Sequence, residues 1–169
     1  HSPKGNIYCS ISFDNFLKIK NHFLYSVLVC VCIKKTLDRF NAKKINFKWP
    51  NDIFFENKKF AGIISESFHL NDKNTFMIVG FGINFISSPI IKNYPSTFIK
   101  SFCEVKNIKE FFSIFIEILF SYLKNLKNQL YDELMEDYEK YLMFKNEKIE
   151  ILLPEKLILT GVFIGINKD

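Results

Sequence analysis

Hydrophobic and polar residues alternate along residues 6–13, so that the side chains from Ile7 to Phe13 divide into one hydrophobic and one polar face. Such alternation predicts a β-strand with one buried face. The stretch 21–40 differs, because its hydrophobic residues are spread around the whole circumference of a helix before lysine and aspartate follow. That distribution predicts a largely buried helix.

Residues 45–49 form a second short hydrophobic run. It predicts a strand that ends at Pro50, because proline has no backbone N–H to donate to a central ladder. The runs 53–55 and 60–65 flank a polar tetrad at 56–59. Two hydrophobic runs around a short polar segment predict a β-hairpin whose turn lies in the tetrad.

A further hydrophobic strand is predicted for residues 76–85, and Gly80 and Gly82 interrupt it. Glycine within a strand often marks a close approach of a ligand to the backbone. Residues 87–101 contain two prolines and are expected to form a loop. The glycine-containing strand is therefore a candidate for ligand binding.

The period of the hydrophobic residues becomes helical over 108–144, where two helices broken near Asn128 are expected. The tail changes again, because 147–153 and 156–166 are rich in residues typical of strands, and Pro154 separates them. Two short strands after a long helical stretch predict a small β module, which is too short to close a barrel alone.

Composition argues against several classes of protein. The chain of 169 residues is 48% hydrophobic and 24% charged, as expected of a folded globular domain. Its net charge of +5 comes from scattered lysines, which gives no basic patch for a nucleic-acid partner. The hydrophobic run 23–33 is shorter than the roughly 20 residues that cross a bilayer. The four cysteines lack the spacing of a zinc site, so we expect a reduced, intracellular protein without a membrane span.

Three short clusters carry the polar residues that suggest chemistry. They are Lys48-Trp49-Pro50-Asn51-Asp52, Lys58-Lys59-Phe60-Ala61-Gly62-Ile63-Ile64 and Gly80-Phe81-Gly82-Ile83-Asn84. Each cluster taken alone is more often structural, since hairpin lysines are usually solvated and Asn-Asp after proline usually forms a turn. Gly80 and Gly82 form no dinucleotide fingerprint, because the third glycine and the following helix are missing.

In combination, the three clusters resemble the motifs of biotin–protein ligases. The family pattern of K-W-P-N-D, a hairpin, K-x-x-G-I and G-x-G-x-N is found at 48–52, 59–63 and 80–84. Upstream, residues 2–10 are similar to the family's S-P-x-G-N-L-Y-x-S strand, and downstream 161–167 looks like part of its small SH3-like module. The resemblance therefore extends over nearly the whole chain.

The resemblance implies an α+β fold, in which a mixed β-sheet backed by helices, akin to a class II aminoacyl-tRNA synthetase core, is followed by the start of an SH3-like module. It divides the chain into a catalytic core at 1–144 and a partial module at 145–169. The implied reaction joins biotin to ATP as biotinyl-5′-AMP, with Mg²⁺, and transfers the biotinyl group to a lysine. That lysine belongs to the biotin carboxyl carrier domain of a biotin-dependent carboxylase. A homodimer is a further implied state.

Roles for individual residues follow from their places in the family motifs. The resemblance assigns catalysis to Lys48, Asp52 and Lys59. It assigns biotin binding to Lys59, Gly62, Ile64, Gly80 and Gly82. It assigns ATP binding to Lys48, Asn51 and Asn84, and Mg²⁺ binding to Asp52. Fixed cations suit this chemistry, because a carboxylate must approach a polyphosphate and the two anions repel each other.

Two alternatives remain open from the sequence. Lipoate–protein ligases are related to the family, although the intact K-W-P-N-D and G-x-G-x-N motifs favour biotin. A catalytically incomplete homologue that only binds biotin or a carrier protein is the second alternative. The family's G-R-G-R-x-G-R loop, which covers the adenylate, does not occur in these 169 residues, so we expect this stretch alone to be inactive.

Overall fold

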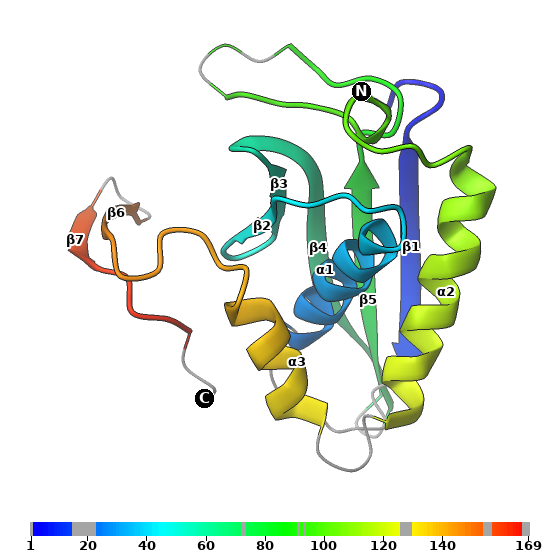
Figure 1. Cartoon of the computed structure of the whole chain (residues 1–169). Coiled ribbons are helices and arrows are strands. Elements are labelled where there is room, and N and C mark those ends of the chain that lie inside the picture. Colours follow the sequence, from blue (N-terminus) through cyan, green and yellow to red (C-terminus); the bar gives the residue numbers. More distant parts are fainter. Residues whose placement is uncertain are drawn as a thin grey trace.

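Five strands form an antiparallel sheet at the centre of the fold (Figure 1). The computed structural model describes residues 2–14, 23–71, 74–90, 92, 94–125, 130–153 and 157–166. The strands of the sheet are β1 (Ile7–Asp14), β2 (Ile45–Lys48), β3 (Asp52–Phe55), β4 (Lys58–Asn71) and β5 (Asn74–Ile83). Their spatial order is β1-β5-β4-β3-β2, and each neighbouring pair is antiparallel. Within the described ranges, parallel pairing is limited to two isolated bridges.

The strands lie close to where the hydrophobic pattern predicts them. Along β1, buried or half-buried hydrophobic residues alternate with exposed residues, as expected. The β3–β4 hairpin has a tighter turn than the predicted tetrad, because Lys58 already pairs with Phe55. Glu56 and Asn57 form the turn with φ values of 44° and 64°, and a two-residue hairpin turn requires this left-handed conformation. β4 also continues well beyond its predicted end at residue 65.

Three helices lie on one side of the sheet (Figure 1): α1 (Phe23–Asp38), α2 (Ile108–Asn125) and α3 (Leu130–Glu139). α1 is buried on nearly all sides, as the sequence predicts, because it contacts β4 and β5 as well as α2 and α3. A short 3₁₀ helix, η1 (Ile99–Ser101), precedes α2. The predicted break near Asn128 lies outside the described residues. No described helix combines the length and hydrophobicity needed to cross a membrane.

Among the described residues, the helices pack on one face of the sheet and leave the other face uncovered. On β5, the ring of Phe81 lies 5.5 Å from the ring of Phe115 on α2. Because successive strand side chains point to opposite faces, Gly80 and Gly82 lie on the face away from α2. Ile64, which is opposite Gly80 on β4, is 64% exposed. The predicted α+β class is confirmed, and the free face of the sheet carries the motif glycines.

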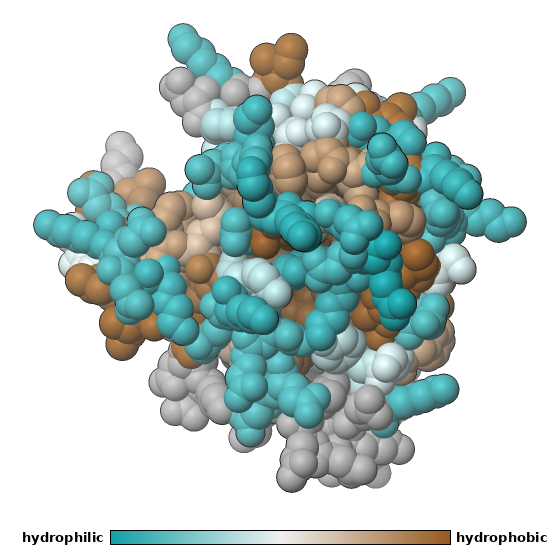
Figure 2. Space-filling view, in the orientation of Figure 1, coloured by the Kyte–Doolittle hydropathy of each residue, from teal (hydrophilic) through white to brown (hydrophobic). Residues whose placement is uncertain are grey.

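The C-terminal residues form a separate antiparallel ribbon of β6 (Lys148–Leu152) and β7 (Ile158–Val162). The two predicted strands are therefore present, and the residues that join them lie outside the described ranges. Figure 2 shows hydrophobic residues gathered over this ribbon, where Leu152 and Val162 are strongly exposed. The ribbon contacts the core through the half-buried Phe163. The division into a catalytic core and an SH3-like module stays a prediction.

Tyr138 on α3 provides a test of the core. Its side chain is fully buried and stacks on Phe47 with a ring-centroid distance of 4.8 Å. Among the described residues, its hydroxyl is the one buried side-chain polar atom without a hydrogen-bond partner. Burying such a group costs about 1–3 kcal/mol, so Tyr138→Phe should raise the free energy of unfolding by about 1 kcal/mol in urea denaturation.

Tyr122→Phe is the matched control, because the hydroxyl of Tyr122 donates to Asp137 Oδ2 at 2.8 Å. This variant removes a satisfied hydrogen bond, and it should lower the free energy of unfolding by about 1–2 kcal/mol. Equal destabilisation by the two variants would mean that the hydroxyl of Tyr138 has a partner in solution.

Candidate active site

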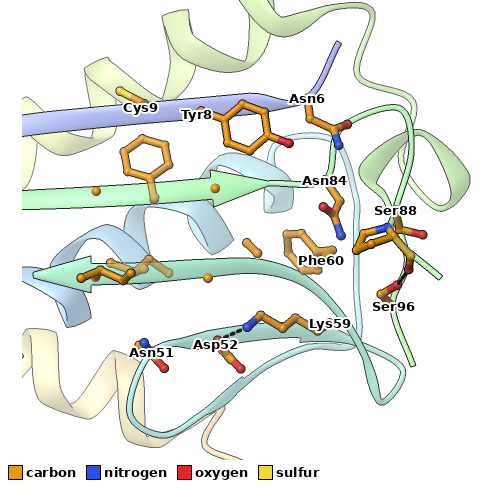
Figure 3. Close-up of a pocket in the computed structure, with 18 of the residues that line it drawn as sticks. Asn6, Tyr8, Cys9, Asn51, Asp52, Lys59, Phe60, Asn84, Ser88 and Ser96 are labelled. Atoms are coloured by element: carbon orange, nitrogen blue, oxygen red, sulfur yellow. Dashed lines mark hydrogen bonds and ion pairs between the residues drawn. The ribbon is translucent and has the colours of Figure 1, made fainter. Parts of the chain in front are cut away.

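A cavity of about 880 Å³ opens over the uncovered face of the sheet. Its walls come from β1, the turn before β3, the β3–β4 hairpin, β5 and the loop after β5 (Figure 3). The motif residues with a predicted role that line it are Asn51, Asp52, Lys59, Gly62, Ile64, Gly80, Gly82 and Asn84. The antiparallel sheet thus brings all three sequence clusters to one cavity.

Glycines form a flat floor for this cavity. In the sheet register, Tyr8 on β1 lies opposite Gly82 on β5. Gly82 in turn lies opposite Gly62, and Gly62 lies opposite Asp52 on β3. The two central positions of this row carry no side chain, and a Cβ at Gly82 would lie 3.7 Å from the ring of Tyr8. A flat ligand can therefore lie directly on the backbone, between an aromatic ring and a charged group.

An ion pair marks one end of the glycine floor. Lys59 Nζ lies 2.5 Å from Asp52 Oδ1, and the two side chains are 30% and 15% exposed (Figure 3). Gly62 leaves room for the pair, since a Cβ there would lie 3.3 Å from Lys59 Nζ and 3.4 Å from Asp52 Oδ1. Partial burial makes the attraction between these charges stronger than in a fully exposed pair.

Tyr94 completes this cluster, although no motif in the sequence points to it. Its hydroxyl donates a hydrogen bond of 2.9 Å to Asp52 Oδ2, so both oxygens of that carboxylate have partners. Burial, together with the hydrogen bond to Asp52, raises the pKa of Tyr94 to about 12. The phenol therefore stays protonated and able to donate at neutral pH.

Backbone hydrogen bonds hold the segment 94–97, called the Tyr94 loop below, against β4. The N–H of Lys59 donates to the carbonyl of Pro95 at 3.0 Å, and the N–H of Thr97 donates to the carbonyl of Lys59 at 2.9 Å. Asn84 adds a side-chain link, because its Nδ2 donates to the carbonyl of Thr97 at 3.0 Å. The lysine whose side chain enters the cavity therefore also positions the loop that forms one wall.

Asn6 joins the start of β1 to the segment that follows β5. Its Oδ1 accepts hydrogen bonds from the N–H groups of Phe85 and Ile86 at 2.9 Å and 3.1 Å. Its Nδ2 donates to the carbonyl of Ser87 at 2.9 Å. Asn6 lies in the quoted N-terminal motif, but the sequence assigns it no role, and the structure gives it a positioning one.

Lys48 alone among the described motif residues with an assigned role does not line the cavity. It lies at the end of β2, and its Nζ is 5.8 Å from the centroid of the Tyr94 ring. Lys59 Nζ is 5.7 Å from the same centroid, so two lysines lie near one tyrosine. The roles assigned to Lys48 and to the other motif residues stay predictions.

The donor groups of the cavity do not form a metal site by themselves. Nowhere in the described part of the chain do three or more His, Cys, Asp or Glu residues gather as metal ligands. Asp52 is the single carboxylate among the residues that line the cavity. Proteins commonly bind Mg²⁺ through one or two carboxylates together with substrate phosphates, so this donor set fits a magnesium ion that arrives with a nucleotide.

Known structures share this fold. The chain is similar to the apo structure of the biotin protein ligase from Aquifex aeolicus, with a TM-score of 0.78 and 22% identity over 97% of this chain and 72% of that chain. It is similar to the same ligase in complex with biotin and ATP, with a TM-score of 0.77 and 22% identity over 97% of this chain and 68% of that chain. The fold is therefore that of a biotin protein ligase core.

Sequence comparison agrees with this likeness. Residues 1–84 match the model of the biotin/lipoate A/B protein ligase family. The bifunctional ligase/repressor BirA of Bacillus subtilis is 28% identical over 90 residues, which make up 53% of this chain and only 28% of that relative. Residues 1–84 therefore carry the match to the biotin/lipoate A/B protein ligase family, and the resemblance of the chain to the catalytic core of a biotin–protein ligase is confirmed.

The Lys59–Asp52 pair can be tested without any ligand. Lys59→Met and Asp52→Asn each remove one charge and leave the other partly buried without its partner, so each should lower the free energy of unfolding. The double variant should lose about 1 kcal/mol less than the sum of the two single variants. Urea denaturation of the four proteins measures this coupling, and a value near zero would show that the pair does not form in solution.

Proposed function

We propose that the protein catalyses the ATP-dependent ligation of biotin to a lysine of a biotin carrier domain through biotinyl-5′-AMP. The Lys59–Asp52 pair at the end of the glycine floor is the observation that carries this proposal. It supplies a fixed cation beside a surface that accepts a flat, largely apolar ligand. Support also comes from a ligase of similar fold whose structure contains biotin and ATP.

Biotin would lie on the glycine floor with its carboxylate toward Lys59. The floor consists of Gly62, Gly80 and Gly82, which offer backbone instead of side chains to the ligand. The exposed side chain of Ile64 forms an apolar border next to Gly80. Burial of the fused rings and the aliphatic chain against this surface would supply most of the binding free energy, at about 25 cal/mol per Å² of apolar area.

The first half-reaction joins two anions. An oxygen of the biotin carboxylate attacks the α-phosphorus of ATP, and pyrophosphate leaves. Because these groups repel each other, catalysis requires fixed positive charge more than proton transfer. Lys59 would hold the carboxylate and then the phosphate of the adenylate. Both the N–H and the carbonyl of Lys59 are hydrogen-bonded to the Tyr94 loop, so little reorganisation of the backbone is needed to place the charge.

ATP would lie toward the turn before β3 and the end of β5. Asn51 and Asn84 line the cavity there and would orient the nucleotide, while Lys48 would add positive charge near the phosphates. A magnesium ion held by Asp52 and the phosphates would neutralise part of the phosphate charge. The backbone carbonyl of Asn51 accepts a hydrogen bond of 2.9 Å from Ile63, which fixes this turn against β4.

The second half-reaction needs a neutral lysine amine from the carrier domain. A free lysine has a pKa of roughly 10.4 and is mostly protonated at neutral pH. Asp52 would accept the proton as the amine nitrogen attacks the acyl carbon and AMP leaves, because it is the carboxylate that lines the described cavity. The outcome is an amide between biotin and the carrier lysine.

Lipoate is the competing substrate, because the family model covers biotin and lipoate ligases. The ligases of similar fold favour biotin. Isothermal titration calorimetry of the chain with biotin and with lipoate decides between them. Tighter binding of lipoate would place the protein in the other branch of the family.

Lys59→Ala should weaken the binding of biotinyl-5′-AMP by about 10–100-fold, because the ligand anion loses a charge-assisted hydrogen bond worth about 1.5–3 kcal/mol. Calorimetry measures the affinity. Lys58→Ala is the matched control, since Lys58 is the neighbouring lysine of β4 and its side chain is exposed. Unchanged affinity in Lys59→Ala, or an equal loss in both variants, would contradict the assignment of Lys59.

Gly82→Val should weaken biotin binding by at least about tenfold, because its side chain would stand on the floor that the ligand rings must cover. Valine is a good strand residue, so the free energy of unfolding should change by less than about 1 kcal/mol. Gly161→Val is the control in β7, where a Cβ would have no neighbour within 4 Å. Unimpaired biotin binding by Gly82→Val would show that the ligand does not lie on this floor.

A further inference from the structure

Asp52 is shared between two donors. Lys59 Nζ lies 2.5 Å from its Oδ1, and the Tyr94 hydroxyl donates to its Oδ2 at 2.9 Å. The Asp52 side chain is only 15% exposed, so water has little access to the carboxylate. The charge of Lys59 is therefore already balanced by a carboxylate of the protein itself.

An anionic ligand must compete with Asp52 for the ammonium of Lys59. Once the ligand takes the ammonium, the carboxylate keeps the hydrogen bond from Tyr94. Without the tyrosine hydroxyl, Asp52 would be left as a mostly buried charge that has lost both of these partners. Leaving a buried charge unpaired is costly, and that cost would be subtracted from the affinity of the ligand.

We propose that Tyr94 is a positioning residue. Its hydroxyl holds the carboxylate of Asp52 in place by a hydrogen bond while an anionic ligand binds the ammonium of Lys59, and it thereby sets the affinity of the cavity for anions. The proposal rests on the proposed function in one respect, which is that the anion is the carboxylate of biotin or the phosphate of its adenylate. Tyr94 acts on the ligand through Asp52 and takes no part in bond formation.

The hydroxyl of Tyr94 can be removed without displacing the rest of the residue. The ring packs edge-on against Phe54, with a centroid distance of 6.5 Å and an interplanar angle of 69°. Two backbone hydrogen bonds hold the loop, one from the N–H of Lys59 to the carbonyl of Pro95 and one from the N–H of Thr97 to the carbonyl of Lys59. Because none of these contacts involves the hydroxyl, Tyr94→Phe removes one hydrogen bond and keeps the packing of the loop.

Biotin and biotinamide separate this role from a merely structural one, because they share the rings and the chain and only biotin carries a negative charge. In calorimetry, Tyr94→Phe should weaken biotin binding about tenfold, as expected for one lost hydrogen bond to a charged group. Its effect on biotinamide should be less than about twofold, because a neutral ligand does not take Lys59 from Asp52. Tyr122→Phe, which removes a comparable Tyr-to-Asp hydrogen bond outside the cavity, should change neither affinity.

The double variant Asp52→Asn, Tyr94→Phe completes the test. With a neutral residue at position 52 no charge needs a partner, so adding Tyr94→Phe should alter biotin affinity by less than about twofold. Equal weakening of biotin and biotinamide by Tyr94→Phe would overturn the inference, as would a tenfold effect that persists in the Asp52→Asn background. Both results would leave the proposed function standing. Failure of the parent chain to bind biotin would overturn the proposed function, and the inference with it.

Discussion

The partly buried ion pair between Lys59 and Asp52 is the contact around which the cavity is arranged. A charge removed from water needs a partner of opposite sign and further hydrogen bonds. Three segments meet this need: the start of β3 brings Asp52, the start of β4 brings Lys59, and the loop after β5 brings Tyr94. The backbone of Lys59 also binds that loop. Lys59 therefore supplies the positive charge and also fixes the position of Tyr94, which donates a hydrogen bond to Asp52.

The pair can face a cavity only because the sheet is covered on one side. α1 is hydrophobic around its whole circumference, so its burial requires the sheet on one side and α2 and α3 on the other. The described α-helices thus pack together on one face of the sheet, and the glycines on the opposite face of the sheet stay accessible. A side chain at Gly62 would meet Lys59 and Asp52 directly, so the absence of a Cβ there serves both the ligand surface and the ion pair.

Local sequence patterns predict the strands, the buried helix and the motif residues, because periodicity and short motifs are local properties. Tyr94 lies beyond their reach, since its partner Asp52 is 42 positions away and the contact depends on how a loop packs against β4. Asn6 is similar, because its hydrogen bonds span 79 to 81 positions and depend on the register of β1 with β5. Lys48 shows the converse: it belongs to the motif and lies opposite Asp52 in the register, yet it is on the edge strand β2 and does not line the cavity.

Pairing Lys59 with Asp52 also changes which anions the cavity can hold. A lysine without a counter-ion attracts any small anion, including inorganic phosphate. Here an anion must displace a carboxylate 2.5 Å away, so it gains only the difference between two similar interactions. A small anion has nothing further to contribute, whereas a ligand that covers the glycine floor adds about 25 cal/mol for each Å² of buried apolar surface. In the proposed function, selectivity for biotin therefore arises from competition with an internal carboxylate combined with burial on the floor, and a lysine alone would not provide it.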